Sequence, residues 1–279
     1  MAQTYADLHT HTTASDGLET PAELVQMASR AGLAAIAIAD HDTVDAHLSL
    51  TDDEHQALIV IPAIEMSANV GTAEVHILGY FIDPTSQALA ESLSQLRRQR
   101  LARVERFCQR LTEIGLPMTM EQVLVHATGE SVGRPHIARA MIDQGYVGSV
   151  NEAFDRYLAG GRPAFVPRDD VTPEWSIELI HSAGGAAVLA HPLTPDDPAA
   201  MMDRLMPAGL DGAEVEYGAY DDTQRTYLRA LAESRGLIPT GGSDFHGAAH
   251  RENAPLGSGG VPQSIVDWLR ERSEGYQRT

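Results

Sequence analysis

The chain has 279 residues, of which 43% are hydrophobic, so it can bury a substantial core and an intrinsically disordered protein is excluded. Its formal net charge of −19, from 39 acidic and 20 basic residues, excludes a protein that coats long nucleic acid through phosphate contacts. A short phosphorylated substrate remains compatible with this charge, because bound cations can reverse the local sign of a site.

The N-terminal residues show no basic segment followed by an apolar run, so we expect neither a signal peptide nor a membrane anchor. No stretch approaches the roughly 20 apolar residues that a membrane-spanning helix needs. The single cysteine, Cys108, cannot form an internal disulfide and suits a reducing compartment. We therefore expect a cytoplasmic protein without a membrane partner.

Short apolar runs alternate with helical patterns in the first part of the chain. Residues 5–8 predict a strand that leads into a polar segment. Thr20, Pro21 and Glu23 have the spacing of an N-cap, a first helical position and a capping box, and Gly32 ends this helix. Further buried strands are predicted at 33–39, 58–64 and 74–82. This order favours a parallel α/β architecture with buried strands.

The middle of the chain has a different pattern from its two ends. A long amphipathic helix rich in Arg and Gln is predicted at 89–114, and shorter helices follow near 120–127, 135–144 and 150–158. The strand and helix alternation then returns, with strands at 186–190, 212–215 and 237–240, helices at 177–183 and 223–235, and a frayed tail at 273–279. We predict a barrel domain of residues 1–87 and 169–279, interrupted by a helical insert domain of residues 88–168.

Histidines and carboxylates gather at the ends of the predicted strands. His9 and His11 are alternate residues of extended chain and can face one ion, and Asp16 follows in a turn. Asp244 and His246 repeat the alternate spacing after the last predicted strand. The other members of this set are His41, Glu65, His76 and His191. Parallel barrels place their active sites at this face, and burying so many ionisable groups together is costly without cations.

The donor set contains imidazole nitrogens and carboxylate oxygens but no thiolate, which suits Zn²⁺, Mn²⁺ or Fe²⁺ rather than a structural zinc site. Asp40 and Asp42 flank His41, and we expect one of them to accept a hydrogen bond from it. The polar surroundings of His47 predict a solvated side chain. The arginines of residues 97–110 predict a solvated helix face.

These motifs, in this order, resemble those of the polymerase-and-histidinol-phosphatase (PHP) family. The resemblance covers residues 5–82 and 175–260 and rests on DLHTHTTASDG, IADHDT, Glu65, EVHILGYF, AHP and GSDFHG. It implies a distorted (β/α)7 barrel with a helical insert, and a centre of three divalent metal ions. By this resemblance the first ion would be held by His9, His11, Glu65 and Asp244. Glu65 would also bind the second ion, together with His76 and His191. The third ion would be held by Asp16, His41 and His246. Asp16 stands where some members have histidine, which favours Mn²⁺, with Zn²⁺ or Fe²⁺ as alternatives.

The predicted insert resembles a subgroup of this family that includes 3′,5′-nucleoside bisphosphate phosphatases, through GRPHIARAMIDQGYV and YLAGGRPAFVP. This resemblance implies removal of the 3′-phosphate, for example from adenosine 3′,5′-bisphosphate to AMP, by a hydroxide that bridges metal ions. The expected catalytic residues are His9, His11, Glu65, His191 and Asp244. Arg134 lies at the start of a predicted helix, where backbone N–H groups favour anions, and is the first candidate for binding a substrate phosphate. The further candidates are His136, Arg162 and Arg168.

Other functions remain open at this point. A 5′–3′ exonuclease acting on short RNA also needs a phosphate held beside a scissile one. A histidinol-phosphatase-like enzyme is disfavoured by GRPHIAR, and an amidohydrolase by Glu65 at a position where a bridging lysine is usual. A non-catalytic, metal-bound regulatory module is disfavoured by the complete set of nine expected ligands. The expected partner is a small phosphorylated nucleotide, or short RNA, rather than a membrane or long nucleic acid.

Overall fold

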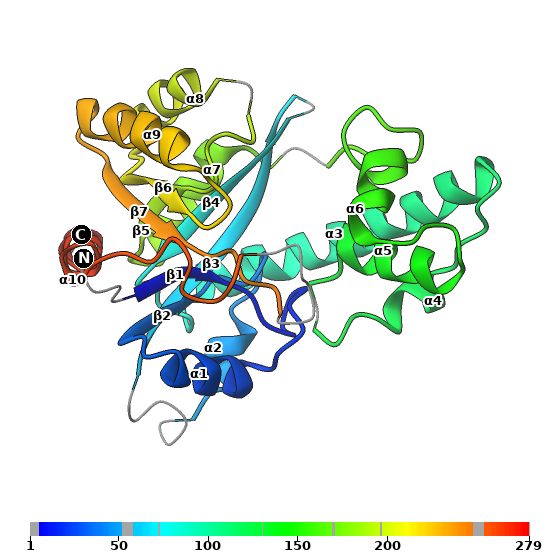
Figure 1. Ribbon diagram of the computed structural model, residues 1–279, viewed down its shortest axis with the longest axis horizontal. Helices are drawn as coiled ribbons and strands as arrows, with labels where there is room; N and C mark the ends of the chain where they lie inside the picture. The colour runs from blue at the N-terminus through cyan, green and yellow to red at the C-terminus, as the bar shows by residue number, and fades with distance from the viewer. Residues whose placement is uncertain are drawn as a thin grey trace.

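A computed structural model of the protein describes residues 6–51, 58–71, 73–129, 131–168, 171–195, 197–247 and 254–278. Its strands form one seven-stranded sheet that follows chain order from β1 to β7 and is nearly closed into a barrel (Figure 1). The strands are β1 (Ala6–Thr10), β2 (Ala35–Ile38), β3 (Ile59–Val70), β4 (Ala73–Tyr80), β5 (Ala186–Leu189), β6 (Gly212–Tyr217) and β7 (Ile238–Gly242). The segment after β7 returns to β1, where the Asp244 N–H donates to the His9 carbonyl at 2.9 Å.

The sheet is mixed, which corrects the prediction of a parallel architecture. Strand β4 is antiparallel to both β3 and β5, whereas the other neighbouring pairs are parallel. Only residues 71 and 72 separate β3 from β4. So short a connection can form a hairpin but cannot cross over to a parallel neighbour. The predicted distorted (β/α)7 barrel with a helical cap is otherwise confirmed.

Helices cover the outside of the barrel. They are α1 (Pro21–Arg30), α2 (Asp45–Ser49), α7 (Pro173–Ser182), α8 (Pro198–Leu205), the 3₁₀ turn η3 (Met206–Ala208), α9 (Asp222–Ser234) and α10 (Gln263–Gln277). The predicted capping box of α1 is present: the Thr20 N–H donates to Glu23 Oε2 at 2.8 Å, and the Glu23 N–H donates to Thr20 Oγ1 at 3.3 Å. No described helix combines the length and the apolar composition needed to cross a membrane.

Apolar side chains of mixed size fill the barrel interior. Alternate residues of the strands face inward and form one cluster, among them Leu8, Ala37, Ala63 and Val188. The residues of β2 that point outward, Ile36 and Ile38, pack against α1 in a second cluster. A third cluster joins the outer side of β3–β6 to α7, α8 and α9. Alanines on β2 and β5 are fully buried there together with Tyr80 of β4, so a packed core lies beneath the polar residues at the barrel mouth.

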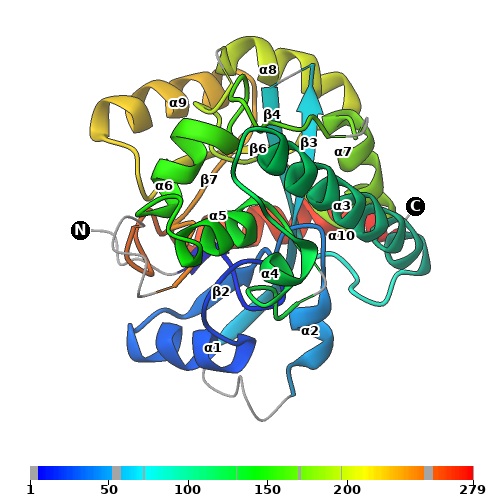
Figure 2. The same cartoon turned by 90° about the vertical axis from the view of Figure 1, so that its right-hand side faces the viewer.

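The predicted insert is helical and lies against one side of the barrel. It contains α3 (Gln87–Glu113), α4 (Met120–Leu124), α5 (Arg134–Asp143), α6 (Val150–Ala153) and a π-helical turn, η2 (Phe154–Leu158). Figure 2 looks onto this side and shows α4, α5 and α6 in front of the strands. This is the side that carries the mouth of the barrel: Ser131 Oγ donates to the His41 carbonyl at 2.5 Å, and Thr128 Oγ1 donates to the Thr13 carbonyl at 2.9 Å.

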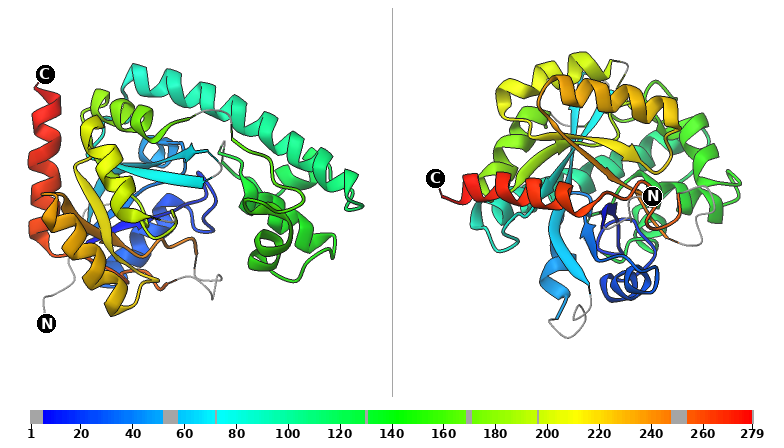
Figure 3. Two further views of the ribbon diagram at one scale, coloured as in Figure 1. Left: turned by 90° about the horizontal axis from the view of Figure 1, so that it is seen from above. Right: turned by 60° about the vertical axis from the view of Figure 1, so that its left-hand side comes forward.

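Helix α3 belongs to two hydrophobic clusters. Leu89 and Leu93 in its first half pack with the barrel, whereas Phe107 and Leu111 in its second half pack with α5 and η2. In the left view of Figure 3 this long helix runs from the barrel to the far side of the insert. The division of the chain into two domains at residues 88 and 168 stays a prediction, and α3 is the element that would join them.

The C-terminal residues correct a second prediction. Residues 273–277 form the last turn of α10 instead of a frayed tail. Ser273 is buried, and the Tyr276 hydroxyl donates to Asp211 Oδ1 at 2.9 Å. The tertiary contact with Asp211 holds a segment whose own sequence, SEGYQ, is mostly polar.

Candidate metal centre

The structure brings all nine predicted metal ligands together at the mouth of the barrel. Three groups have ligand atoms within 4.8 Å of one another and could each hold a metal ion: His11, Asp16, His41 and His246; His9, His11 and Asp244; and His41, Glu65 and His76. His191 adjoins them, with its Nε2 atom 3.1 Å from Glu65 Oε1. The contributing segments are β1, β3, β4 and the loops after β1, β2, β5 and β7.

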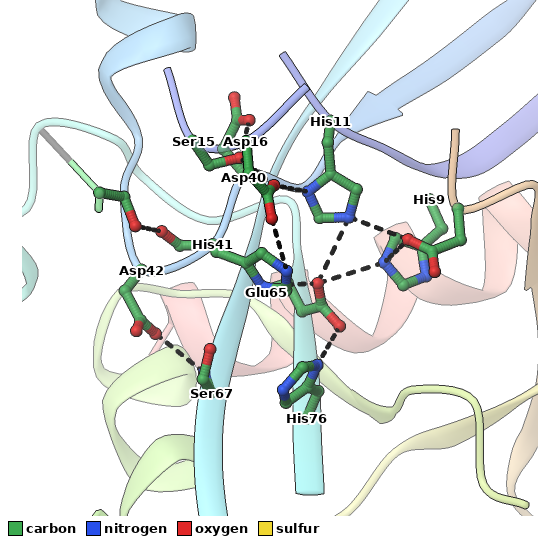
Figure 4. A network of polar contacts seen from close by, with 12 residues as sticks. His9, His11, Ser15, Asp16, Asp40, His41, Asp42, Glu65, Ser67 and His76 are labelled. Carbon is green, nitrogen blue, oxygen red and sulfur yellow. Dashed lines mark hydrogen bonds and ion pairs between the residues drawn. The ribbon is translucent and has the colours of Figure 1, made fainter. Parts of the chain in front are cut away.

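Glu65 lies at the centre of the cluster, and the imidazoles of His9, His11, His41 and His76 surround it (Figure 4). Its two oxygens face different histidines. Oε2 lies 2.9 Å from His41 Nδ1 and 3.4 Å from Nε2 of both His9 and His11, whereas Oε1 lies 2.8 Å from His76 Nδ1. A carboxylate in this position can bridge two cations. Glu65 does not end its strand as predicted, because β3 continues to Val70 through its pairing with β4.

Buried polar atoms in the cluster lack hydrogen bonds from the rest of the described chain. These atoms are His9 Nε2, His11 Nδ1, His11 Nε2, His41 Nδ1 and Glu65 Oε2. A buried polar atom without a hydrogen bond costs about 1–3 kcal/mol, so five in one place would be a heavy cost. Nitrogen and carboxylate oxygen donors that converge without competing hydrogen bonds fit divalent cations.

The electrostatics of the cluster follow from burial and from the mixture of carboxylates and imidazoles. Burial alone would raise the pKa of Glu65, but His41, His76 and His9 lower it well below its usual value. Burial and the neighbouring His246 lower the pKa of His11 to about 4. An ionised Glu65 and a neutral His11 are the forms that bind a cation.

Asp40 and Asp42 hold the loops of the site and do not accept from His41, which corrects the prediction for this pair. Asp40 accepts from the backbone N–H and the hydroxyl of Thr12 at 2.8 and 2.7 Å. Asp42 Oδ1 accepts from the Ser67 N–H at 2.8 Å. His47, which was expected to be solvated, is largely enclosed, with its Nε2 atom 2.8 Å from the Ile38 carbonyl and 3.0 Å from the Ala63 N–H.

A cavity of about 180 Å³ connects the metal cluster to the insert. At one end it is lined by Asp16, His41, His76 and His246 of the cluster. The rest of its lining includes Ser67, Glu74, Arg100, Arg103, Phe107, Ser131, Arg134, Phe154 and Arg168. One cavity is therefore lined both by guanidinium groups and by candidate metal ligands.

The four arginines of the cavity are held by two carboxylates. Asp42 Oδ2 pairs with Arg100 at 2.6 Å and with Arg168 at 2.7 Å, and Glu74 pairs with Arg103 and Arg134. Burial opposes ionisation of both carboxylates, but the arginines lower the pKa of Asp42 to about 2 and, with His76, that of Glu74 to about 2. Both carboxylates are therefore ionised at neutral pH.

The predicted substrate-binding residues are placed differently from one another. Arg134 and Arg168 line the cavity, whereas Arg162 is exposed and lies outside its lining. His136 is buried, and its Nδ1 atom accepts from the Gly133 N–H at 3.0 Å, so it caps α5 instead of facing the cavity. Arg100 and Arg103 also line the cavity, although the pattern of this helix predicted a solvated face for them. The three-residue spacing of Arg97, Arg100 and Arg103, which places them on one helix face, was the available signal.

Comparisons with known proteins agree with this site. A family model described as "PHP domain" matches residues 7–119. The chain is 37% identical over 247 residues to the "5′-3′ exoribonuclease Rnm" of Escherichia coli (strain K12), covering 86% of this chain and 84% of the relative. The chain belongs to the PHP family. It is also 33% identical over 248 residues to a "3′,5′-nucleoside bisphosphate phosphatase" of Chromobacterium violaceum, covering 86% of each chain.

Solved structures extend the likeness to nearly the whole PHP chain. A Bifidobacterium adolescentis protein, provisionally described as a metal-dependent phosphoesterase, superposes with a TM-score of 0.87 at 30% identity, covering 97% of this chain and 96% of that one. A Chromobacterium violaceum structure described as an amidohydrolase, with sulfate bound and no metal, has a TM-score of 0.85 at 30% identity, covering 96% of each chain. The protein is a metal-dependent phosphoesterase, and the expected family and hydrolase activity are confirmed.

Proposed function

We propose that this PHP phosphoesterase removes the 3′-phosphate of nucleoside 3′,5′-bisphosphates and leaves a 5′-monophosphate. The cavity carries this proposal, because its lining combines candidate metal ligands with a group of four arginines, which we call the arginine end. A substrate with two phosphate groups offers one to each end. A substrate with a single phosphate leaves one end unfilled. The relative named as a 3′,5′-nucleoside bisphosphate phosphatase supports the same choice.

The proposed metal ligands are the nine residues predicted from the sequence, and we propose that they hold three divalent cations, with Mn²⁺ favoured over Zn²⁺ or Fe²⁺. When bound, such cations supply Lewis acidity toward phosphoryl oxygens and an activated water. Glu65 would bridge two of them, since its two oxygens face different histidines. The proposed catalytic residues are His9, His11, Glu65, His191 and Asp244.

The charge of the arginine end matches a phosphate group. Its cations are Arg100, Arg103, Arg134 and Arg168, and its anions are Asp42 and Glu74. Four positive and two negative charges leave two positive charges without a counterpart in this set. A phosphate monoester carries about −1.5 to −2 charges at pH 7, so one monoester balances this end.

The arginines are held in place by their surroundings. Arg100 NH2 donates to Ser67 Oγ and Arg168 NH1 to the Ser67 carbonyl, both at 2.9 Å. The guanidinium of Arg134 lies 5.0 Å from the ring centre of Phe154. Guanidinium groups fixed by such contacts lose less conformational entropy when they bind an anion. The arginine end can therefore hold one phosphate while the other reaches the metal cluster.

A second candidate function is 5′–3′ exonuclease activity on short RNA, which the name and 37% identity of the Escherichia coli relative favour. In that case the arginine end would bind the 5′-phosphate and the metal cluster would act on the following phosphodiester. The proposed partners are thus a phosphorylated nucleotide or short RNA, and the single Cys108 favours a cytoplasmic location.

Product analysis separates the two functions. Purified enzyme is incubated with adenosine 3′,5′-bisphosphate, adenosine 3′-monophosphate and a 5′-phosphorylated RNA trimer, each with Mn²⁺ or Zn²⁺. We expect the bisphosphate to release one phosphate and yield AMP, with a much higher kcat/KM than the 3′-monophosphate. Equal kcat/KM for these two nucleotides would refute a role for the arginine end. Release of 5′-mononucleotides from the trimer, without turnover of the bisphosphate, would favour the exonuclease.

Substitution of Arg134 tests the arginine end directly. Arg134→Ala removes a charge-assisted contact worth about 1.5–3 kcal/mol, which lowers kcat/KM for the bisphosphate about 10- to 150-fold. Hydrolysis of the 3′-monophosphate should change little. Arg162→Ala is the matched control, because Arg162 also lies in the insert but is exposed outside the cavity lining. Unchanged bisphosphate kinetics in Arg134→Ala would contradict this role.

A further inference from the structure

Strand β6 sends two polar side chains to the metal cluster, although it supplies none of the nine proposed ligands. Glu214 is fully buried, and its Oε1 atom lies 2.9 Å from His9 Nδ1. Its Oε2 atom accepts from the His191 N–H at 2.8 Å. The hydroxyl of Tyr217 donates to Asp244 Oδ2 at 2.7 Å. Both side chains therefore contact proposed ligands at atoms that do not face the other ligands, His9 Nδ1 and Asp244 Oδ2.

A bulge in β6 makes this arrangement possible. Glu214 pairs with Thr240 of β7, and Glu216 pairs with the next residue, Gly241, so Val215 is an extra residue in β6. Residues 214 and 216 of a regular strand would share one face. The extra residue shifts this alternation, so Glu214 and Tyr217 both face the cluster. Glu216 instead pairs with Arg229 on α9, outside the barrel.

We propose that Glu214 and Tyr217 are positioning residues that aim His9 and Asp244 at one shared cation. Asp244 Oδ1 lies 3.3 Å from His9 Nε2 and 3.1 Å from His11 Nε2, so the three donors converge. Glu214 contacts the other ring nitrogen of His9, Nδ1, and Tyr217 contacts the other carboxylate oxygen of Asp244, Oδ2. The inference rests on the proposed metal ligands and adds the residues that orient them.

The chemistry of Glu214 explains why a carboxylate is needed. One oxygen faces a backbone N–H of His191, which can only donate. The other accepts from His9 Nδ1–H, which leaves the Nε2 lone pair for a cation. Glutamine cannot serve both partners. If its carbonyl accepts from His191, its NH₂ group faces His9 Nδ1 and favours the tautomer with the proton on Nε2.

Tyr217 acts on Asp244 in a different way. Its hydroxyl binds Oδ2 and thereby fixes the rotation of the carboxylate, so that Oδ1 stays directed at His9 and His11. Asp244 has a backbone φ of 56°, in the left-handed region that residues other than glycine seldom adopt. Its side-chain direction is therefore not set by ordinary strand geometry. A hydrogen bond from the neighbouring strand supplies that direction.

The test compares Mn²⁺ binding in matched pairs of variants. Wild type, Glu214→Gln and Tyr217→Phe are stripped with a chelator and titrated with Mn²⁺ by calorimetry and by the Mn²⁺ paramagnetic resonance signal. Glu216→Gln, on the same strand, and Tyr220→Phe, whose hydroxyl accepts from the Leu193 N–H at 3.0 Å, are the controls. We expect Glu214→Gln and Tyr217→Phe to lose about 10- to 100-fold in affinity at one site. The controls should bind as wild type does.

Thermal melting distinguishes positioning from a general structural role. A structural role lowers Tm equally with and without Mn²⁺, whereas a positioning role reduces the rise in Tm that Mn²⁺ produces. Glu214→Asp, which keeps the charge on a shorter side chain, should recover part of that rise. If Glu214→Gln does not fold, the Mn²⁺ affinity of Glu214→Asp is compared with that of Glu216→Gln instead.

Each outcome decides the inference. Mn²⁺ affinity in Glu214→Gln equal to that of Glu216→Gln would overturn the role of Glu214, and equal affinity in Tyr217→Phe and Tyr220→Phe would overturn that of Tyr217. Wild-type enzyme that binds neither Mn²⁺ nor Zn²⁺ would instead contradict the proposed ligands themselves. The two failures are thus distinguishable.

Discussion

Replacing Asp42 with asparagine removes a negative charge from the arginine end of the cavity and keeps the shape of the side chain. Asp42 is fully buried, and its Oδ2 atom accepts from Arg100 Nε and Arg168 NH2, both at 2.7 Å. Its backbone φ is 52°, a conformation that asparagine tolerates as well as aspartate does. The substitution therefore perturbs charge without straining the loop after β2.

The magnitude follows from the pKa of Asp42. Burial alone would raise this pKa, but Arg100 and Arg168 lower it from 3.8 to about 2. Because the folded-state pKa is depressed, the ionised group stabilises the fold above about pH 4, and this contribution is lost as pH falls toward 2. The difference corresponds to about 2 kcal/mol. The variant also leaves two buried guanidiniums with a weaker partner, so the expected loss is about 3–5 kcal/mol.

Urea unfolding at pH 7 measures this loss. Asp42→Asn should lower the midpoint with an unchanged slope, by an amount equivalent to about 3–5 kcal/mol. Asp45→Asn is the matched control, because Asp45 pairs with Arg97 at 2.8 Å but is 35% exposed. Such a pair contributes about 1 kcal/mol or less. A loss below 1 kcal/mol in Asp42→Asn would refute the reasoning.

Three further predictions concern the metal cluster. Removing metal with a chelator should lower Tm, because the clustered donors lose their counter-charges, and adding Mn²⁺ should restore it; an unchanged Tm would contradict a cation at the site. Gly242→Ala should weaken Mn²⁺ binding at least tenfold, since an added Cβ would lie 2.4 Å from His9 Cβ, and wild-type affinity would show that β1 can move away. His9→Ala should abolish phosphate release while circular dichroism stays native, and near-wild-type turnover of the metal-loaded variant would refute its catalytic role.

The metal cluster was predictable from the sequence because its members occur in local pairs with a fixed geometry. His9 and His11, like Asp244 and His246, are two residues apart in extended chain, so each pair points one way before any tertiary contact is known. The capping box of Thr20 and Glu23 was predictable for the same reason. In each case the interaction spans no more than four residues.

Tertiary structure decided the features that depend on partners far apart in the chain. Arg100 and Arg103 lie on a helix face that read as solvated, and only the placement of Asp42 and Glu74 draws them into the cavity. Glu214 reaches the cluster because one extra residue in β6 changes its pairing with β7. Strand pairing and the burial of a charge are set by free energies that include both partners. A pattern within one segment describes only one of the two partners. The sequence therefore determined which side chains can bind metal, and the fold decided which residues surround them.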